Sequence, residues 1–177
     1  MNGKNKIFHT TTAGLIGYYM VKTFPERGFD VVGLFKNSGY FRVNLEFYRF
    51  DEYGIYQEDL EKSQKMVKSI SNDGYRFIRM NLEDSQDLFF LLENEKYVKV
   101  VNLAMRVGVL YGLENPYYDD VSNVVWFIKT IKEYRYEDVK HLVFSSSSSV
   151  FGYNIKKKIS NPTACIIPCA SMLTPRK

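Results

Sequence analysis

The sequence predicts an α/β fold, a doubly wound parallel sheet with helices on both of its faces. Three observations support this prediction. Apolar segments of strand length alternate with segments of helical periodicity along most of the chain. Two glycines, Gly14 and Gly17, lie in the turn between the first expected strand and the first expected helix. Residues 98–104 are almost wholly apolar, which is typical of a strand covered on both faces.

The first elements form a strand–helix–strand unit with the size of a βαβ crossover. Residues 6–9 are an apolar-rich run that fits a strand, and apolar residues from 16 to 24 recur at helical spacing. Gly28 is expected to end this helix, because glycine just past the last turn is a common stop signal. Residues 29–35 follow as the second strand.

The alternation continues as far as residue 144. Apolar residues at 60, 66, 67 and 70 predict a helix over 56–71. The remaining expected elements are strands over 75–80, 98–104 and 141–144 and helices over 84–94 and 119–134. A parallel sheet of this kind binds ligands at the carboxyl ends of its strands.

The charge and composition exclude several functional classes. Of 24 basic residues six follow the last acidic residue, Asp138, so residues 1–138 carry 18 bases against 20 acids. This near-neutral body argues against a nucleic-acid surface, and the late bases indicate a solvated tail, although an adaptor for anionic partners is a weaker alternative.

We expect no membrane span, no secretory leader and a cytoplasmic location. Cys165 and Cys169 have no nearby histidine, so we expect neither a disulfide framework nor a metal site.

The glycine turn has two interpretations on its own. Backbone amides at the start of the helix would face a pyrophosphate, or the glycines would only allow the helix and strand to pack closely. Four further segments bear on this choice, because they follow the turn in the order and at the intervals of one enzyme family. The five segments are 10–17, 101–104, 108–116, 122–123 and 141–152.

Together these segments resemble the extended short-chain dehydrogenase/reductase family, in particular NAD-dependent nucleotide-sugar epimerases of the UDP-glucuronate 4-epimerase type. The resemblance runs from about Lys6 to Asn154 and covers only the cofactor-binding half of such an enzyme. It implies a Rossmann-type domain at 1–154, followed by an irregular basic tail at 155–177. The sugar-binding half would follow residue 177, so we expect a truncated enzyme.

The resemblance assigns roles to individual positions. The pyrophosphate loop corresponds to Gly14, Leu15, Ile16 and Gly17, with Thr11 at its first glycine position. The other implied NAD contacts are Phe35 at the ribose, Asn81 and Leu82 beside the adenine, Leu103 and Ala104 in the cleft, and Asn123 on the long helix. Ser147 matches the serine that hydrogen-bonds the reacting sugar hydroxyl, although five consecutive serines are also consistent with a plain polar loop.

Two of these positions depart from the family pattern in the cofactor site. Thr11 replaces a glycine, and a β-branched residue is poorly suited to the left-handed backbone of a tight turn. Phe35 replaces an acidic residue that would accept hydrogen bonds from the ribose hydroxyls, a loss of about 1–3 kcal/mol. We therefore predict weakened NAD binding.

The catalytic base is the most consequential departure. The family uses a tyrosine followed four residues later by a lysine, whose charge lowers the tyrosine pKa. The expected positions hold Met172 and Arg176, neither of which can serve. Tyr153 and Lys157 have the right spacing, but they follow the serines too closely to lie on the required helix.

The resemblance therefore leaves open whether the chain is an enzyme. The first hypothesis is the NAD-binding domain of an epimerase that removes and returns hydride at C4 of a UDP-sugar, catalytically impaired alone. The alternative is a non-catalytic remnant that acts as a dinucleotide-binding or protein-interaction module. The family commonly pairs through two helices per subunit, so helices 84–94 and 119–134 are candidates for a homodimer interface.

Overall fold

The computed structural model describes residues 5–36, 43–60, 65–80, 85–104 and 126–146. Its strands are β1 (Lys6–Thr10), β2 (Asp30–Phe35), β3 (Met66–Lys68), β4 (Tyr75–Arg79), β5 (Lys99–Asn102) and β6 (His141–Phe144). Its helices are α1 (Leu15–Glu26), α2 (Val43–Glu52), α3 (Gln57–Leu60), α4 (Ser85–Glu95) and α7 (Trp126–Tyr136). The chain divides into two compact units, and the sheet belongs to the first, Met1–Ala104 with Ile128–Phe144. The second unit, Met105–Phe127 with Ser145–Lys177, falls almost wholly outside the described residues.

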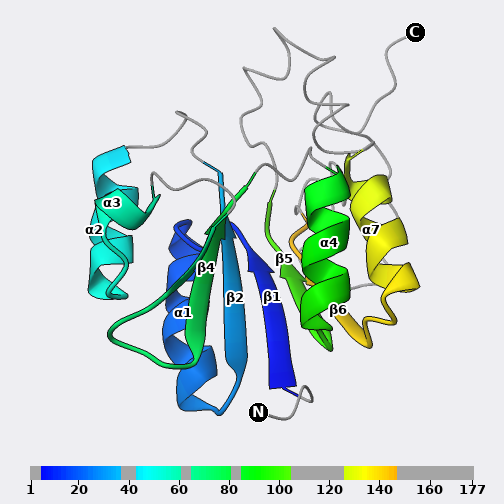
Figure 1. Cartoon of the computed structure of the whole chain (residues 1–177), viewed down its shortest axis with the longest axis horizontal. Coiled ribbons are helices and arrows are strands. Elements are labelled where there is room, and N and C mark those ends of the chain that lie inside the picture. Colours follow the sequence, from blue (N-terminus) through cyan, green and yellow to red (C-terminus); the bar gives the residue numbers. More distant parts are fainter. Residues whose placement is uncertain (1–4, 37–42, 61–64, 81–84, 105–125, 147–177) are drawn as a thin grey trace, which may run out of the picture. The chain divides into compact units, whose positions relative to one another are not determined.

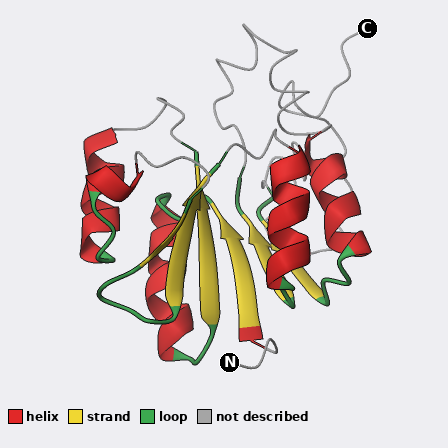
Figure 2. Cartoon of the chain, in the orientation of Figure 1, coloured by secondary structure: helices red, strands yellow, loops and turns green. Residues whose placement is uncertain are grey.

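The six strands form one sheet in the order β3-β4-β2-β1-β5-β6 (Figures 1 and 2). Every neighbouring pair is parallel except β3 with β4, so the predicted parallel α/β sheet is confirmed with an antiparallel edge strand. The first strand lies in the middle, and the chain moves outward from it in both directions. The strand order therefore reverses between β1 and β5, where ligands bind in folds of this type.

The helix expected over 56–71 is wrong. Of the residues that the structure describes in this range, Gln57–Leu60 alone is helical, and Met66–Lys68 instead forms β3, which folds back on β4 as a hairpin. Residues 72–74 read Asn-Asp-Gly, and the Asn72 side-chain oxygen accepts the backbone N–H of Gly74 at 2.9 Å. This turn chemistry outweighs the helical spacing of a few apolar residues. Helix α2 was not expected at all.

Alternating residues of the strands point to opposite faces of the sheet. On one face α1 and α2 cover a cluster that includes Ile7 and Val31, and the backbone carbonyl of Tyr18 on α1 accepts a hydrogen bond from Tyr53, just past α2. Phe8 pairs with Val32 and Val100 one position along from Ile7 and Val31, so these three side chains point to the other face of the sheet. Helices α4 and α7 lie on that side (Figure 1). Burial on both faces explains why the central strands are almost wholly apolar.

Candidate functional site

The carboxyl end of β1 leads directly into the glycine turn. Thr11 has a φ of +60°, the left-handed conformation that the turn requires and that glycine adopts most easily. The Thr11 carbonyl accepts the N–H of Gly14 at 3.1 Å, which closes the turn before α1 begins. The backbone shape expected of a glycine is therefore retained by a threonine, at a cost of about 1–2 kcal/mol.

The two glycines of the turn have different structural roles. A Cβ at Gly17 would clash with the Thr11 carbonyl oxygen and would lie 3.1 Å from Cε1 of His9, so α1 packs against β1 at this point. A Cβ at Gly14 would lie 3.1 Å from Cγ2 of Thr11. Close packing is therefore enough to explain why residue 17 is a glycine. The methyl group of Thr11 lies on the Gly14 side of the turn.

The start of α1 provides backbone donors for an anion. The N–H groups of Leu15, Ile16 and Gly17 lie in the first turn of the helix, where no intrahelical acceptor exists. Leu15 and Ile16 are exposed at 64% and 59%, so this turn faces outward. These positions fit a pyrophosphate, as the resemblance implies.

A hydroxyl group that the sequence analysis overlooked connects the carboxyl ends of β1 and β5. Oγ1 of Thr10 donates to the Asn102 side-chain oxygen at 2.9 Å and accepts the N–H groups of Leu103 and Ala104, each at 2.9 Å. Thr10 and Asn102 are buried. The segment after β5 is thereby held against the end of β1. The sequence signal for this link was a polar residue at the end of each of the two strands, Thr10 on β1 and Asn102 on β5.

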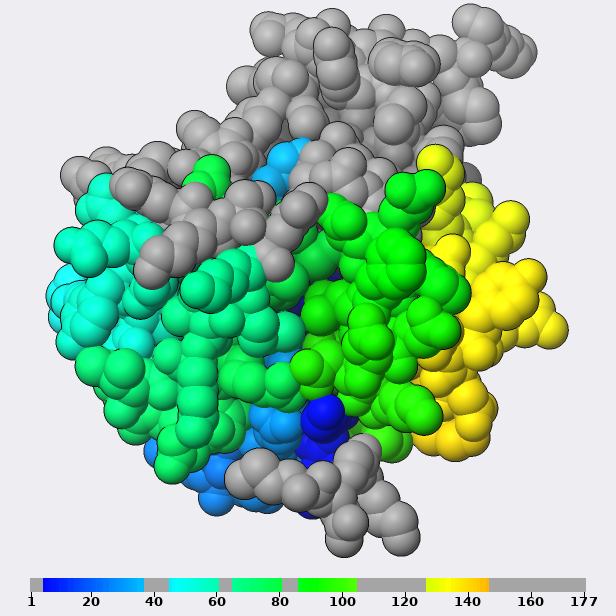
Figure 3. All heavy atoms as spheres, viewed as in Figure 1, coloured from blue at the N-terminus to red at the C-terminus, as the bar shows by residue number. Residues whose placement is uncertain are grey.

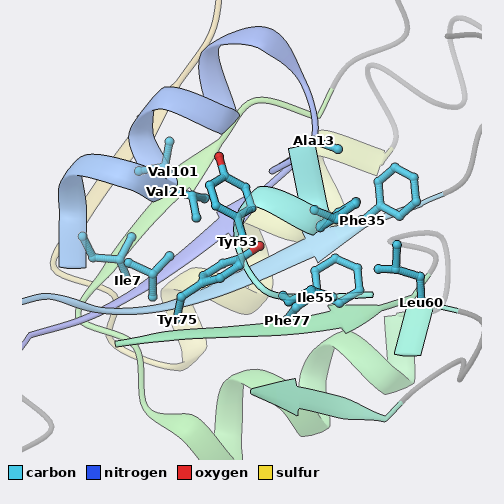
Figure 4. Close-up of a cluster of buried hydrophobic side chains, with 12 residues drawn as sticks. Ile7, Ala13, Val21, Phe35, Tyr53, Ile55, Leu60, Tyr75, Phe77 and Val101 are labelled. Atoms are coloured by element: carbon cyan, nitrogen blue, oxygen red, sulfur yellow. The ribbon is translucent and has the colours of Figure 1, made fainter. Parts of the chain in front are cut away.

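Phe35 is part of the hydrophobic core. It is 4% exposed, and its ring centroid lies 5.0 Å from that of Phe50 and 6.2 Å from that of Phe77. Figure 4 shows it inside the core cluster, on the side of Phe77 and Leu60. The end of β2 therefore supplies no carboxylate and no exposed ring to a ribose. Its burial is also inconsistent with packing of this ring on an adenine.

Arg49 on α2 is a second residue that the sequence analysis missed. Its guanidinium donates to the backbone carbonyl of Ala13, inside the glycine turn, and lies 5.7 Å from the ring centroid of Tyr18. It is half-buried. No signal in the sequence linked α2 to the turn, because this helix was not predicted.

Beneath the turn lie buried polar groups without partners among the described residues. His9 is completely buried, and neither ring nitrogen makes a hydrogen bond there. Burial lowers the pKa of His9 to about 4, so the ring is neutral near pH 7. The Tyr75 hydroxyl, also without a partner, fills the space above Gly33, and burial raises its pKa. His9 is thus a packing residue.

The remaining assigned positions lie outside the described residues. They are Asn81, Leu82, Asn123, Ser147, Met172 and Arg176, together with the alternative pair Tyr153 and Lys157. Their roles stay predictions. Among the described residues, no group of three histidine, cysteine or acidic side chains is arranged to hold a metal ion. No helix in that same part of the chain is long and apolar enough to cross a membrane.

The described residues suit the pyrophosphate of a dinucleotide better than its ribose. The glycine turn and the first turn of α1 suit a pyrophosphate, and Leu103 and Ala104 lie at the end of the neighbouring central strand. The end of β2, where a carboxylate would accept ribose hydroxyls, holds a buried aromatic ring.

Comparison with known proteins gives consistent matches over most of the chain. The family described as GDP-mannose 4,6 dehydratase matches residues 10–168. Protein CapI of Staphylococcus aureus is 32% identical over 155 residues, which are 88% of this chain and 41% of that protein. A probable UDP-glucuronate 4-epimerase of Rhizobium meliloti (strain 1021) is 29% identical over 147 residues, 83% of this chain and 38% of that protein.

Solved structures show the same fold. The UDP-glucose 4-epimerase of Stenotrophomonas maltophila, with bound NAD and formylated UDP-arabinopyranose, has a TM-score of 0.70 and 18% identity. The match covers 90% of this chain and 42% of that one. The chain thus spans well under half the length of the relatives and structures that it matches.

Proposed function

Because the chain belongs to the GDP-mannose 4,6 dehydratase family of NAD-dependent epimerases and dehydratases, we propose that it is the dinucleotide-binding part of a nucleotide-sugar epimerase. The glycine turn is the observation that carries this proposal. Thr11 keeps the left-handed conformation, and Gly17 packs against its carbonyl, so the start of α1 presents its N–H groups as an anion site. NAD is the proposed cofactor and a UDP-sugar the proposed substrate.

The reaction class is epimerisation at C4 of the sugar, with UDP-glucuronate as the proposed substrate. The name of the Rhizobium meliloti relative supports this choice. When bound, NAD would supply the hydride acceptor. The amides of residues 15–17 would hold its pyrophosphate, Thr10 would keep the segment after β5 in place, and Ser147 would hydrogen-bond the reacting hydroxyl.

Binding is tested by titrating the chain with NAD and following the fluorescence of its sole tryptophan, Trp126. We expect saturable but weak binding, because Thr11 adds bulk to the turn and Phe35 supplies no carboxylate. Gly17→Ala should abolish it, since the new methyl group clashes with the turn. Glu26→Ala, at the other end of the same helix, is the matched control and should bind as the natural chain does. No response at millimolar NAD would contradict the proposal.

Catalysis is expected to be impaired in this chain alone. Ser147 is followed at the expected distance by Met172 and Arg176, and a thioether cannot exchange a proton. Both the base and the sugar-binding half would have to come from outside residues 1–177. The chain is incubated with UDP-glucuronate and NAD, and the products are separated by chromatography. Formation of UDP-galacturonate would overturn this part of the proposal.

A second candidate function is a non-catalytic remnant that binds a dinucleotide or another protein. The burial of Phe35 favours it, because a core aromatic ring replaces the ribose-binding carboxylate. Saturable NAD binding without turnover would indicate a dinucleotide-binding module. Turnover in the presence of the sugar-binding half of a relative, such as the Rhizobium meliloti epimerase, would instead favour the enzyme.

A homodimer through α4 and α7 is part of the same proposal. The two helices lie side by side on one side of the sheet (Figures 1 and 3). Their exposed large apolar side chains are Phe90 at 57%, Ile128 at 51%, Ile131 at 37% and Tyr136 at 82%. Exposed apolar side chains on these helices would suit a matching surface on a second copy.

A further inference from the structure

We propose that Arg49 and Tyr53 are positioning residues of the dinucleotide site. They hold two backbone carbonyls, one in the glycine turn and one in α1, and so keep the N–H groups between these carbonyls available to a pyrophosphate. The inference rests on the proposed dinucleotide function and adds the side chains that maintain the shape of the anion site. Neither side chain is assigned a contact with the cofactor itself.

Two hydrogen bonds from the region of α2 reach the backbone on either side of the anion site. The Arg49 guanidinium donates to the carbonyl of Ala13 in the glycine turn. The hydroxyl of Tyr53, just past α2, donates to the carbonyl of Tyr18 in α1. The N–H groups of residues 15–17 lie between these two carbonyls in the sequence. The two bonds therefore hold the backbone just before and just after the amides that would bind the anion.

The Ala13 carbonyl is also the acceptor that a longer helix would use. In an α-helix each N–H donates to the carbonyl four residues earlier. The first such bond of α1 joins the N–H of Tyr18 to the carbonyl of Gly14 at 2.9 Å. Extension of the helix by one residue would pair the N–H of Gly17 with the carbonyl of Ala13. Because Arg49 supplies a donor to this carbonyl, the N–H of Gly17 is left for a ligand.

Aromatic packing holds Arg49 in this position. Its guanidinium lies 5.7 Å from the ring centroid of Tyr18, which in turn lies 5.3 Å from that of Tyr53. The next residue along α2, Phe50, is completely buried, and its ring centroid lies 4.7 Å from that of Phe77. The side chain of Arg49 thus comes from a helix anchored in the core, and its contact with the turn is made before any ligand binds.

The carboxylates of α2 favour this indirect role over a direct pair between Arg49 and a phosphate. Glu52 accepts hydrogen bonds from the hydroxyl of Tyr18 and the ammonium group of Lys22. Glu46 is buried, and burial raises the pKa of its carboxyl, an effect that Arg49 opposes. Negative charge on the same helix weakens the attraction of Arg49 for an anionic ligand. Its hydrogen bond to the backbone of the turn does not depend on that attraction.

The test is a calorimetric titration of the full chain with NAD. Arg49→Met keeps an unbranched side chain but donates no hydrogen bond, and we expect its dissociation constant to rise about tenfold, the effect of one hydrogen bond from a charged group. Arg49→Lys retains a charged donor and should recover most of the affinity. Tyr48→Phe, which removes an exposed hydroxyl from the same helix, is the matched control and should bind NAD as the natural chain does.

A second readout separates positioning of the turn from a general loss of stability. Hydrogen exchange at the N–H of Gly17 is followed by NMR without ligand. In Arg49→Met this exchange should become slower, because the N–H can pair with the carbonyl of Ala13 once Arg49 no longer occupies it. A merely structural contribution of Arg49 would have the opposite effect, since a less stable chain opens more often and exchanges faster.

Tyr53→Phe keeps the test decisive if Arg49→Met fails to fold. It removes one hydroxyl oxygen and should raise the dissociation constant for NAD about threefold. Unchanged NAD affinity in Arg49→Met, or in Tyr53→Phe where the first variant does not fold, would overturn this inference and leave the proposed function intact. Faster exchange at Gly17 in Arg49→Met would do the same. Absence of NAD binding by the natural chain would overturn both.

Discussion

Thr11 shows how one residue preserves a turn that its side chain disfavours. The left-handed backbone costs a β-branched residue about 1–2 kcal/mol, whereas a glycine adopts it freely. The surrounding contacts, the Gly14 N–H on the Thr11 carbonyl and the packing of Gly17, hold the residue there. The strain is therefore localised at a position that belongs to the proposed cofactor site.

Thr11→Gly is predicted to raise the free energy of unfolding by about 0.5–1 kcal/mol. Relief of the left-handed strain is partly offset by the greater flexibility of glycine in the unfolded chain. Urea unfolding measures the change. Thr12→Gly is the control, because Thr12 is buried and does not share the positive φ, so it should lose stability. Equal destabilisation by both substitutions would contradict the assignment of strain to Thr11.

His9 makes stability depend on pH. Burial lowers the pKa of His9 to about 4 in the folded chain, against an ordinary value of 6.5. Between these values the unfolded chain binds a proton that the folded chain does not, so the free energy of unfolding falls as the pH is lowered. The loss amounts to about 3 kcal/mol and is complete below about pH 4.

His9→Leu should remove this part of the pH dependence. Comparing urea unfolding at pH 7 and pH 4.5 for both proteins isolates it, because the carboxyl groups are common to both. The chain has only two histidines, and the exposed His141 gives the matched control His141→Gln, which should keep the full pH dependence. An unchanged pH dependence in His9→Leu would show that His9 is not the group responsible.

At the scale of elements, the Thr10 hydroxyl connects the ends of β1 and β5. Thr10→Val keeps the side-chain shape but leaves two backbone N–H groups and the Asn102 side-chain oxygen without this partner. We expect a loss of about 2 kcal/mol in stability and faster hydrogen exchange at the amides of Leu103 and Ala104. Thr12→Val, which removes a single 3.4 Å bond to the Leu34 carbonyl, should cost less than about 1 kcal/mol. Unchanged exchange at Leu103 and Ala104 would argue against a positioning role.

Elements with a strong apolar period could be predicted from the sequence. The central strands and α1 and α4 lie where the pattern indicated, and Gly28 ends α1 with a φ of +79°. The hairpin of β3 and β4 could not be predicted from that period, because a short edge strand has too few buried residues to produce one. Its signal was instead the turn at 72–74.

The sequence predicted the glycine turn of the candidate site but not the packing of Phe35 or the contact of Arg49. The glycine turn is a local feature of the sequence, and its position at the end of β1 follows from the alternation of strands and helices. The burial of Phe35 and the contact of Arg49 with Ala13 both depend on α2, an unpredicted helix whose packing brings distant residues together. Contacts of this kind are set by tertiary structure and leave no periodic signal.

At the scale of the whole molecule, ion pairs join the opposite end of the sheet to α4. Arg76 on β4 binds Glu95 at the end of α4 at 2.7 Å and Asp30 on β2 at 3.0 Å, and Lys6 on β1 also binds Glu95 at 2.7 Å. These contacts hold the pKa of Glu95 down to about 2. The carboxyl end of the sheet thus carries the strained turn at Thr11 and the buried, uncharged His9, whereas the opposite end is held together by these ion pairs.

Helices α4 and α7 are among the elements that expose large apolar side chains, and for these two helices we predict association. If this surface mediates a dimer, light scattering after size-exclusion chromatography should give twice the chain mass of 20.7 kDa. Ile128→Glu should yield a monomer, because a charge buried opposite its own copy is unpaired. Ile70→Glu, at a more exposed position beyond the far edge strand β3, should leave the dimer intact. A monomeric natural chain at micromolar concentration, or a dimer that survives Ile128→Glu, would show that these helices are not the interface.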